Sequence, residues 1–255
     1  MQITFLGTGT SQGVPIIGCE CDVCQSEDSK DKRLRSSIFV EWKGVKMVVD
    51  TGPDFRYQLL RAGIKDVDAV LYTHEHRDHI AGLDDIRPIN FLLDKSIDVY
   101  ATDLVEVALK RDYHYIFSGN NYPGIPQIQM HKIKNAPFEV MGNEIVPIEG
   151  MHYKLPVFGF RFKDFVYITD MNYLSEIEKE KIKGAKVLVL NALRREAHIS
   201  HFTLQEAIDL ANELEVPQVY FTHISHQLGK QQDVGLELPQ NMRIAYDGLQ
   251  IELDD

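Results

Sequence analysis

The stretch THEHRDHIAGL, residues 73–83, decides the fold, because it places metal-ligand side chains directly behind the apolar run DAVLY. The pattern is H-x-H-x-D-H, formed by His74, His76, Asp78 and His79. Residues i and i+2 after a strand point the same way, so His74 and His76 can reach one cation. Asp78 and His79, where the chain turns toward a helix, can then bind a second cation. Imidazole and carboxylate ligands suit Zn²⁺, Mn²⁺ or Fe²⁺.

Two cations need further ligands, and the later sequence offers donors at the ends of other predicted strands. These donors are His152 after VPIEGM, Asp170 after FVYIT and His223 after QVYFT. The two carboxylate oxygens of Asp170 can bridge a pair of metals. A lone histidine at a strand end is more often structural than a ligand, but the whole series favours a di-metal site. The isolated His114 and His131 are predicted to be surface or packing residues.

Every cysteine of the chain lies in GCECDVCQ, residues 18–25, as Cys19, Cys21 and Cys24. An odd number of cysteines in one loop does not form a disulfide framework. A structural zinc site normally has four ligands, and His226, three residues beyond His223, is the candidate for the fourth. Free thiols are an alternative, and a redox pair is disfavoured because no C-x-x-C precedes a helix.

The composition is that of a globular protein, with 44% apolar and 25% charged residues among 255. We expect a single domain over residues 1–255.

The start MQITFLGTGTSQG does not match a secretory signal, and no window reaches about 18 apolar residues, so we expect a cytoplasmic protein with no membrane partner. The net charge of −11 argues against an extended nucleic-acid surface. The GTGTSQG loop lacks the spacing of a dinucleotide-binding motif.

Three segments carry clear secondary-structure signals. SSIFVEW and VKMVVD, separated by Lys43 and Gly44, predict a β-hairpin. TLQEAIDLANEL predicts an amphipathic helix capped by Thr203. IAYDGLQIEL predicts a closing hairpin around Asp247 and Gly248.

THEHRDHI, followed in order by the three later donors, resembles the signature of the metallo-β-lactamase superfamily along the whole chain. The resemblance implies an α/β fold, the αββα sandwich, with a di-metal site at one edge. It implies that one metal is held by His74, His76 and His152 and the other by Asp78, His79 and His223, with Asp170 bridging.

A closer resemblance rests on GTGTSQGVP, the cysteine loop, LRSS, GLDDIRP, LPVFGFRF, NALRREAHISHFT and THISH. These segments are similar to the cyclic phosphodiesterase branch associated with carbon-phosphorus lyase, which opens phosphoribosyl 1,2-cyclic phosphate. That branch is related to the tRNA 3′-processing endonucleases. The resemblance implies two active-site divalent ions, Zn or Mn, and one structural Zn in a Cys3His site. It also implies a small phosphodiester substrate and is compatible with a homodimer.

The predicted reaction is attack on phosphorus by a water activated between two cations. The ribose oxygen that leaves needs a proton, and His201 in HISHFT is the candidate acid. By resemblance, His201 takes the place of the histidine that follows the bridging aspartate in the phosphodiesterase branches. His198 is the competitor, and Asp78 is a second catalytic candidate that orients the attacking water. Arg194 and Arg195 could meet phosphate, but a solvated charge pair is the favoured reading.

Three other functions share parts of this residue pattern. A tRNA 3′-processing endonuclease usually needs a basic arm, and none is visible between His79 and His152. Lactam or thioester hydrolysis uses similar metal ligands but does not need the His201 segment. A noncatalytic binding scaffold is disfavoured because the ligand set is complete.

Overall fold

The computed structural model describes residues 1–119 and 122–254, and the chain packs as two compact units. The first unit comprises Met1–Leu6, Ser37–Lys134 and Gln250–Asp255, and the second comprises Gly7–Ser36 and Asn135–Leu249. Both units are therefore assembled from separated stretches of the chain. The expectation of one domain over residues 1–255 stays a prediction.

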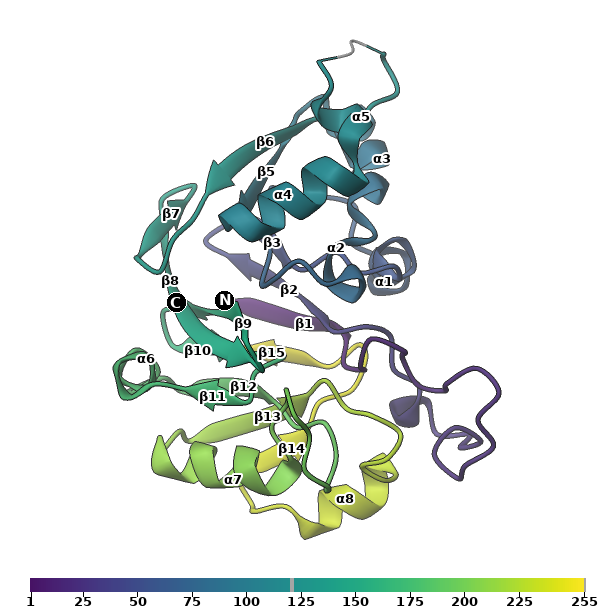
Figure 1. The fold of residues 1–255 in the computed structure, drawn as a ribbon, viewed down its shortest axis with the longest axis vertical. Coiled ribbons are helices and arrows are strands. Elements are labelled where there is room, and N and C mark those ends of the chain that lie inside the picture. The colour runs from purple at the N-terminus through teal and green to yellow at the C-terminus, as the bar shows by residue number, and fades with distance from the viewer. Residues whose placement is uncertain (120–121, 255) are drawn as a thin grey trace. The chain divides into compact units, whose positions relative to one another are not determined.

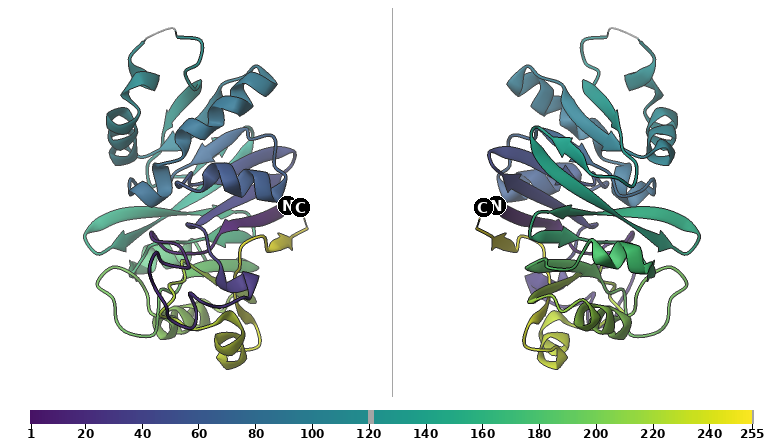
Figure 2. Two further views of the ribbon diagram at one scale, coloured as in Figure 1. Left: turned by 90° about the vertical axis from the view of Figure 1, so that its right-hand side faces the viewer. Right: turned by 90° about the vertical axis from the view of Figure 1, so that its left-hand side faces the viewer.

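The first unit is built on a mixed sheet with the strand order β15-β1-β2-β3-β4-β5-β6 (Figure 1). The strands are β1 (Gln2–Gly7), β2 (Ser37–Trp42), β3 (Val45–Val49), β4 (Ala69–Leu71), β5 (Ile97–Ala101), β6 (Ile128–Lys132) and β15 (Gln250–Glu252). Strands β3 to β6 run parallel, whereas β15 is antiparallel to β1. The Met1 amino group donates to the Leu253 carbonyl at 2.7 Å, so the two ends lie side by side (Figure 2).

The predicted hairpin is confirmed: β2 and β3 pair antiparallel around Lys43 and Gly44, which have φ of 49° and 77°. Positive φ at both central residues is what a tight hairpin turn requires. Helices cover the parallel strands with an apolar core between (Figure 1). The helices are α1 (Phe55–Ala62), α2 (Arg77–Ile80), η2 (Leu83–Ile86), α3 (Arg87–Leu93), α4 (Asp103–Asp112) and α5 (His114–Phe117).

The second unit is built on another mixed sheet, with the order β11-β8-β9-β10-β12-β13-β14 and with β7 paired to β8. The strands are β7 (Phe138–Val140), β8 (Asn143–His152), β9 (Leu155–Phe162), β10 (Phe165–Tyr167), β11 (Tyr173–Leu174), β12 (Val187–Asn191), β13 (Gln218–Thr222) and β14 (Met242–Ile244). The helices are η1 (Ser29–Asp31), α6 (Glu176–Glu180), α7 (Leu204–Glu213) and α8 (Gln231–Glu237). Strands β10, β12, β13 and β14 run parallel.

The predicted helix after Thr203 is confirmed as α7, and its start carries a capping box. The Thr203 hydroxyl accepts from the Glu206 backbone at 3.2 Å, and the Glu206 carboxylate accepts from the Thr203 backbone at 2.8 Å. This reciprocal pair satisfies two backbone donors that the first helical turn leaves without partners. The apolar face of α7 packs on β12 and β13, which fixes the position of the loop before it.

The prediction of a closing hairpin around Asp247 and Gly248 is wrong. β14 pairs parallel with β13 in the second unit, and β15 pairs with β1 in the first. The Asp247 carboxylate explains the difference, because it accepts from the Thr8 hydroxyl at 2.7 Å and the Leu34 backbone at 2.8 Å. These long-range hydrogen bonds take the place of a local turn, and residue spacing does not reveal them.

None of the helices in residues 1–119 and 122–254 is both long and apolar enough to cross a bilayer.

Candidate metal centres and the loop around His201

The first unit brings His74, His76, Asp78 and His79 together where the chain leaves β4 and enters α2. The ring centroid of His74 lies 4.6 Å from that of His76 and 4.2 Å from that of His79. The Asp78 carboxylate lies 3.3 Å from Nε2 of His79. The predicted H-x-H-x-D-H cluster is thus a compact set of nitrogen and oxygen donors.

Asp50, which follows β3, holds this cluster in place. Its carboxylate lies 2.7 Å from Nδ1 of His79 and accepts from the backbone and hydroxyl of Thr73 at 2.9 and 2.8 Å. The Thr73 hydroxyl also lies 3.0 Å from Nδ1 of His74. Because this hydroxyl donates its hydrogen bond to Asp50, it can only accept one from His74. Both histidines therefore carry their proton on Nδ1, which leaves Nε2 with the lone pair that a metal needs.

Asp50 is a functional candidate that the sequence analysis missed. It is fully buried and has a φ of 65°, a backbone conformation that is uncommon outside glycine. Burial raises the pKa of Asp50, while the neighbouring His79 ring and Thr73 donors lower it. The available signal was an aspartate directly after the β-branched run VKMVV, in the same position that other donors occupy after their strands.

The second unit places His152 at the end of β8, Asp170 shortly after the end of β10 and His223 directly after β13, all strands of its one sheet. Nδ1 of His152 donates to the Ser200 carbonyl at 2.9 Å, which leaves its Nε2 with a lone pair. The Asp170 carboxylate lies 3.1 Å from Nδ1 of His223. Asp170 and His223 have φ of 58° and 56°. Backbone strain of this kind is often found at functional sites, where the surrounding structure maintains it.

His201 lies within the donor set of the second unit rather than outside it. Its ring centroid is 4.6 Å from that of His152 and 4.7 Å from that of His223. One ligand atom each from His152, Asp170 and His201 lie within 4.8 Å of one another. Burial and the nearby His223 lower the pKa of His201 well below its usual value, so its ring is neutral at physiological pH. His198, the competitor, is next to it, with ring centroids 5.0 Å apart.

The cysteine loop meets His226 as predicted. Nδ1 of His226 lies 3.4 Å from the sulfur of Cys19, 3.3 Å from that of Cys21 and 3.6 Å from that of Cys24. A tetrahedral zinc with bonds of about 2.0 Å to nitrogen and about 2.3 Å to sulfur separates these atoms by about 3.5 Å. The observed spacing therefore fits a Cys3His zinc site.

The surroundings of the sulfurs also suit metal ligation. The backbone N–H of Cys24 points to the Cys21 sulfur at 3.5 Å, and the backbone N–H of Ile16 points to the Cys24 sulfur at 3.4 Å. The Cys24 backbone and the His226 ring lower the pKa of Cys21 to about 6, so Cys21 is a thiolate at neutral pH. Burial raises the pKa of Cys24 to about 11, and a bound cation would reverse that effect.

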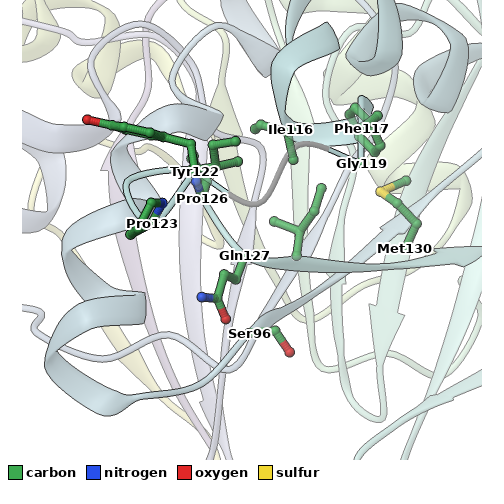
Figure 3. Close-up of a pocket in the computed structure, with 11 residues that line it drawn as sticks. Ser96, Ile116, Phe117, Gly119, Tyr122, Pro123, Pro126, Gln127 and Met130 are labelled. Carbon is green, nitrogen blue, oxygen red and sulfur yellow. The ribbon is translucent and has the colours of Figure 1, made fainter.

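The remaining histidines behave as packing and surface residues. His131 lies 2.7 Å from the Asp98 carboxylate, and its ring stacks on Tyr100 with centroids 4.7 Å apart. His114 is exposed on α5. A cavity of about 590 Å³ in the first unit, lined by residues such as Tyr122, Pro126 and Met130, contains none of the predicted ligands (Figure 3).

Comparison with known proteins identifies the family. Residues 46–224 match the family model described as a β-lactamase superfamily domain. The structure matches that of a new diphosphatase from the PhnP family with a TM-score of 0.93 and 39% identity, covering 99% of this chain and 98% of the other. The chain therefore belongs to the β-lactamase superfamily. The likeness to the diphosphatase, which extends over both whole chains, puts it in the PhnP family within that superfamily.

The predicted fold class, the αββα sandwich of the metallo-β-lactamase type, is confirmed by these matches. Among curated sequences, the chain is 39% identical to an octanoyltransferase of Porphyromonas gingivalis over 100% of this chain and 52% of that protein. A ribonuclease Z of Pyrobaculum calidifontis is 24% identical over 88% of this chain and 87% of its own length. The chain spans about half the length of the first curated relatives that it matches.

We expect Asp50→Asn to weaken metal binding at the His74–His79 cluster by about 10- to 100-fold, the usual cost of losing a carboxylate behind a ligand histidine. The asparagine keeps an acceptor for Thr73 but can present an N–H to His79 and disturb its tautomer. Titration of zinc or manganese against a competing chelator measures the change. Asp112→Asn, which alters a surface ion pair with Arg77, is the matched control. Equal affinities in the two variants would contradict the orienting role.

We expect Cys21→Ser to lower the zinc content of protein purified without chelator by about one ion per chain, because a structural zinc site needs all its ligands. Elemental analysis measures the content. Asp22→Asn changes the neighbouring exposed residue and is expected to leave it unchanged. Equal zinc in all three proteins would exclude the Cys3His site.

Proposed function

We propose that this chain is a metal-dependent phosphodiesterase that hydrolyses a small cyclic or nucleotide-like phosphate ester. Phosphoribosyl 1,2-cyclic phosphate is the first substrate to test. The observation that carries the proposal is His201 beside His152 and Asp170, because the resemblance associates a histidine at this place with phosphodiester cleavage. Membership of the PhnP family, in which the matched structure is a diphosphatase, supports it.

The proposal assigns the ligands as the family resemblance does. His74, His76 and His152 would hold one divalent ion, and Asp78, His79 and His223 the other, with Asp170 bridging. Zinc and manganese both suit these donors. Two such ions, when bound, would polarise the phosphoryl oxygens and lower the pKa of the attacking water.

The residues of the chain then have separate tasks. Asp50 and the Ser200 carbonyl fix the ring orientation of His79 and His152 through their Nδ1 atoms. Asp78 would orient the attacking water. His201 would donate a proton to the oxygen that leaves phosphorus.

The low pKa of His201 constrains how it can act as the acid. A neutral ring has one N–H, and it can donate a hydrogen bond to the leaving oxygen. Full protonation needs an anion in addition to the Asp170 carboxylate, which already lies 3.9 Å from Nδ1 of His201, because a negative charge raises the pKa of a histidine. A phosphate ester supplies that charge only when it is bound, so we propose that His201 becomes an acid in the substrate complex.

Two other activities have specific support and are tested with the same panel. The likeness to ribonuclease Z suggests cleavage of precursor tRNA, although the net charge of −11 disfavours a large nucleic-acid surface. The likeness to the octanoyltransferase covers half of that protein, so acyl transfer is a weaker candidate.

The decisive assay compares substrates on protein reconstituted with zinc or manganese. The panel is bis-p-nitrophenyl phosphate, a 2′,3′-cyclic nucleotide, phosphoribosyl 1,2-cyclic phosphate, a precursor tRNA, a lactam, a thioester and an octanoyl donor. We expect hydrolysis of the small phosphodiesters, loss of it after chelation, and its return when the metal is restored. Activity confined to tRNA, lactam, thioester or octanoyl substrates would overturn the proposal.

His201→Ala is expected to lower kcat by about 10²- to 10⁴-fold, the usual contribution of a general acid, with the metal content retained. Turnover and elemental analysis are measured together, because loss of metal would mean that His201 is a ligand and not the acid. His198→Ala tests the competitor, and His114→Ala on the exposed helix α5 is the control. Full activity of His201→Ala would remove the proposed role.

A further inference from the structure

The second unit contains a polar cavity of about 250 Å³ beside His201 and His223. Its walls include Arg194 and His198, which come from the loop after β12, and Ser11 and Gln12 from the loop after β1. We infer that this cavity binds a second phosphoryl group of the substrate and that Arg194 is the residue that recognises it. The inference rests on the proposed function and adds a specificity-determining residue, Arg194, for phosphate esters that carry a further phosphoryl group.

Arg194 is anchored entirely by neutral acceptors. Its guanidinium donates to the Gln227 side-chain oxygen at 2.8 Å, to the Ala197 carbonyl at 3.1 Å and to the Glu196 carbonyl at 3.3 Å. These bonds hold the planar group in one orientation at the cavity wall. Three of its five N–H groups are used in this way, and two are left to donate to a ligand.

No carboxylate in residues 1–119 and 122–254 forms an ion pair with Arg194. The adjacent Arg195 is different, since its guanidinium lies 2.9 Å from the Glu237 carboxylate on the surface. The two neighbouring arginines therefore differ in their partners: Arg195 is exposed and paired with a carboxylate, whereas Arg194 is half-buried and hydrogen-bonds only to neutral groups. A fixed cation without a counterion favours an anionic ligand.

The rest of the cavity is consistent with an anion of modest size. Burial lowers the pKa of His198, and the positive charge of Arg194 lowers it further. The charge of Arg194 therefore acts on the groups that line the cavity. A volume of about 250 Å³ is below the usual range of about 300–1,000 Å³ for sites that enclose a drug-sized molecule. A phosphoryl group fits such a space, and the guanidinium fork can bind two of its oxygens.

Two kinds of ester present a second phosphoryl group. In a sugar cyclic phosphate the second group is a phosphomonoester elsewhere on the sugar, and in a diphosphate it is the next group along the P–O–P chain. Both place an anion a short distance from the phosphorus that reacts, and the experiment distinguishes them.

The test compares kcat/KM for wild type, Arg194→Gln, Arg194→Lys and Arg195→Gln. The substrates are phosphoribosyl 1,2-cyclic phosphate, a nucleoside diphosphate sugar, and bis-p-nitrophenyl phosphate, which has one phosphorus. We expect Arg194→Gln to lower kcat/KM by at least about tenfold on a substrate with two phosphoryl groups, mainly through KM, as for a lost charged hydrogen bond. The loss on bis-p-nitrophenyl phosphate is expected to be much smaller. Arg194→Lys should retain part of the activity on the substrates with two phosphoryl groups, because lysine keeps the positive charge but not the guanidinium fork.

The outcomes separate the inference from the proposed function. A selective loss on the cyclic sugar phosphate or on the diphosphate supports the inference and tells which kind of ester uses the cavity. An equal loss on all three substrates, or a loss equal to that of Arg195→Gln, overturns it while leaving the phosphodiesterase proposal intact. No turnover of any phosphate ester by metal-loaded wild type overturns both. Circular dichroism and metal content confirm that each variant is folded and loaded.

Discussion

The carboxylate of Asp50 is the constraint on which the first donor cluster depends. A fully buried charge is costly unless hydrogen bonds surround it, and here Thr73 and His79 provide them. The same bonds determine which nitrogen of His74 and His79 is free of a proton. Stability of the buried acid and readiness of the histidines for a cation therefore come from one set of contacts. Neither could be changed without affecting the other.

The second unit reaches a similar result by other means. The Ser200 carbonyl accepts a hydrogen bond from Nδ1 of His152, and Asp170 and His223, which follow β10 and β13, have a backbone in the left-handed region. The helix α7, with its capping box at Thr203, fixes the loop that contains Ser200 and His201. Ligand geometry here depends on the backbone together with two side-chain contacts, from Thr169 to the Asp170 carboxylate and between Ser36 and His223.

Much of this could be predicted from the sequence because it depends on local order. The H-x-H-x-D-H cluster, the hairpin at Lys43 and Gly44, and the capped helix α7 are each set by residues a few positions apart. The features that escaped depend on partners far along the chain. Asp247 bonds to Thr8 and Leu34 and prevents the expected hairpin. Arg194 and Arg195 are neighbours in sequence, and only their surroundings in three dimensions distinguish them.

The meeting of the cysteine loop with His226 has a consequence for the order of folding. The segment Gly7–Ser36 belongs to a unit whose other part, Asn135–Leu249, is made much later during synthesis. Arg33 donates to the Ala245 carbonyl at 2.6 Å. This hydrogen bond, which anchors the segment, can form only after residue 245 has been synthesised. A zinc ion shared by Cys19 and His226 would close a loop of 207 residues, and a cross-link of that length removes about 5 kcal/mol of chain entropy from the unfolded state. Such an ion would link the first loop of the second unit to the segment after β13, as a disulfide does in other proteins.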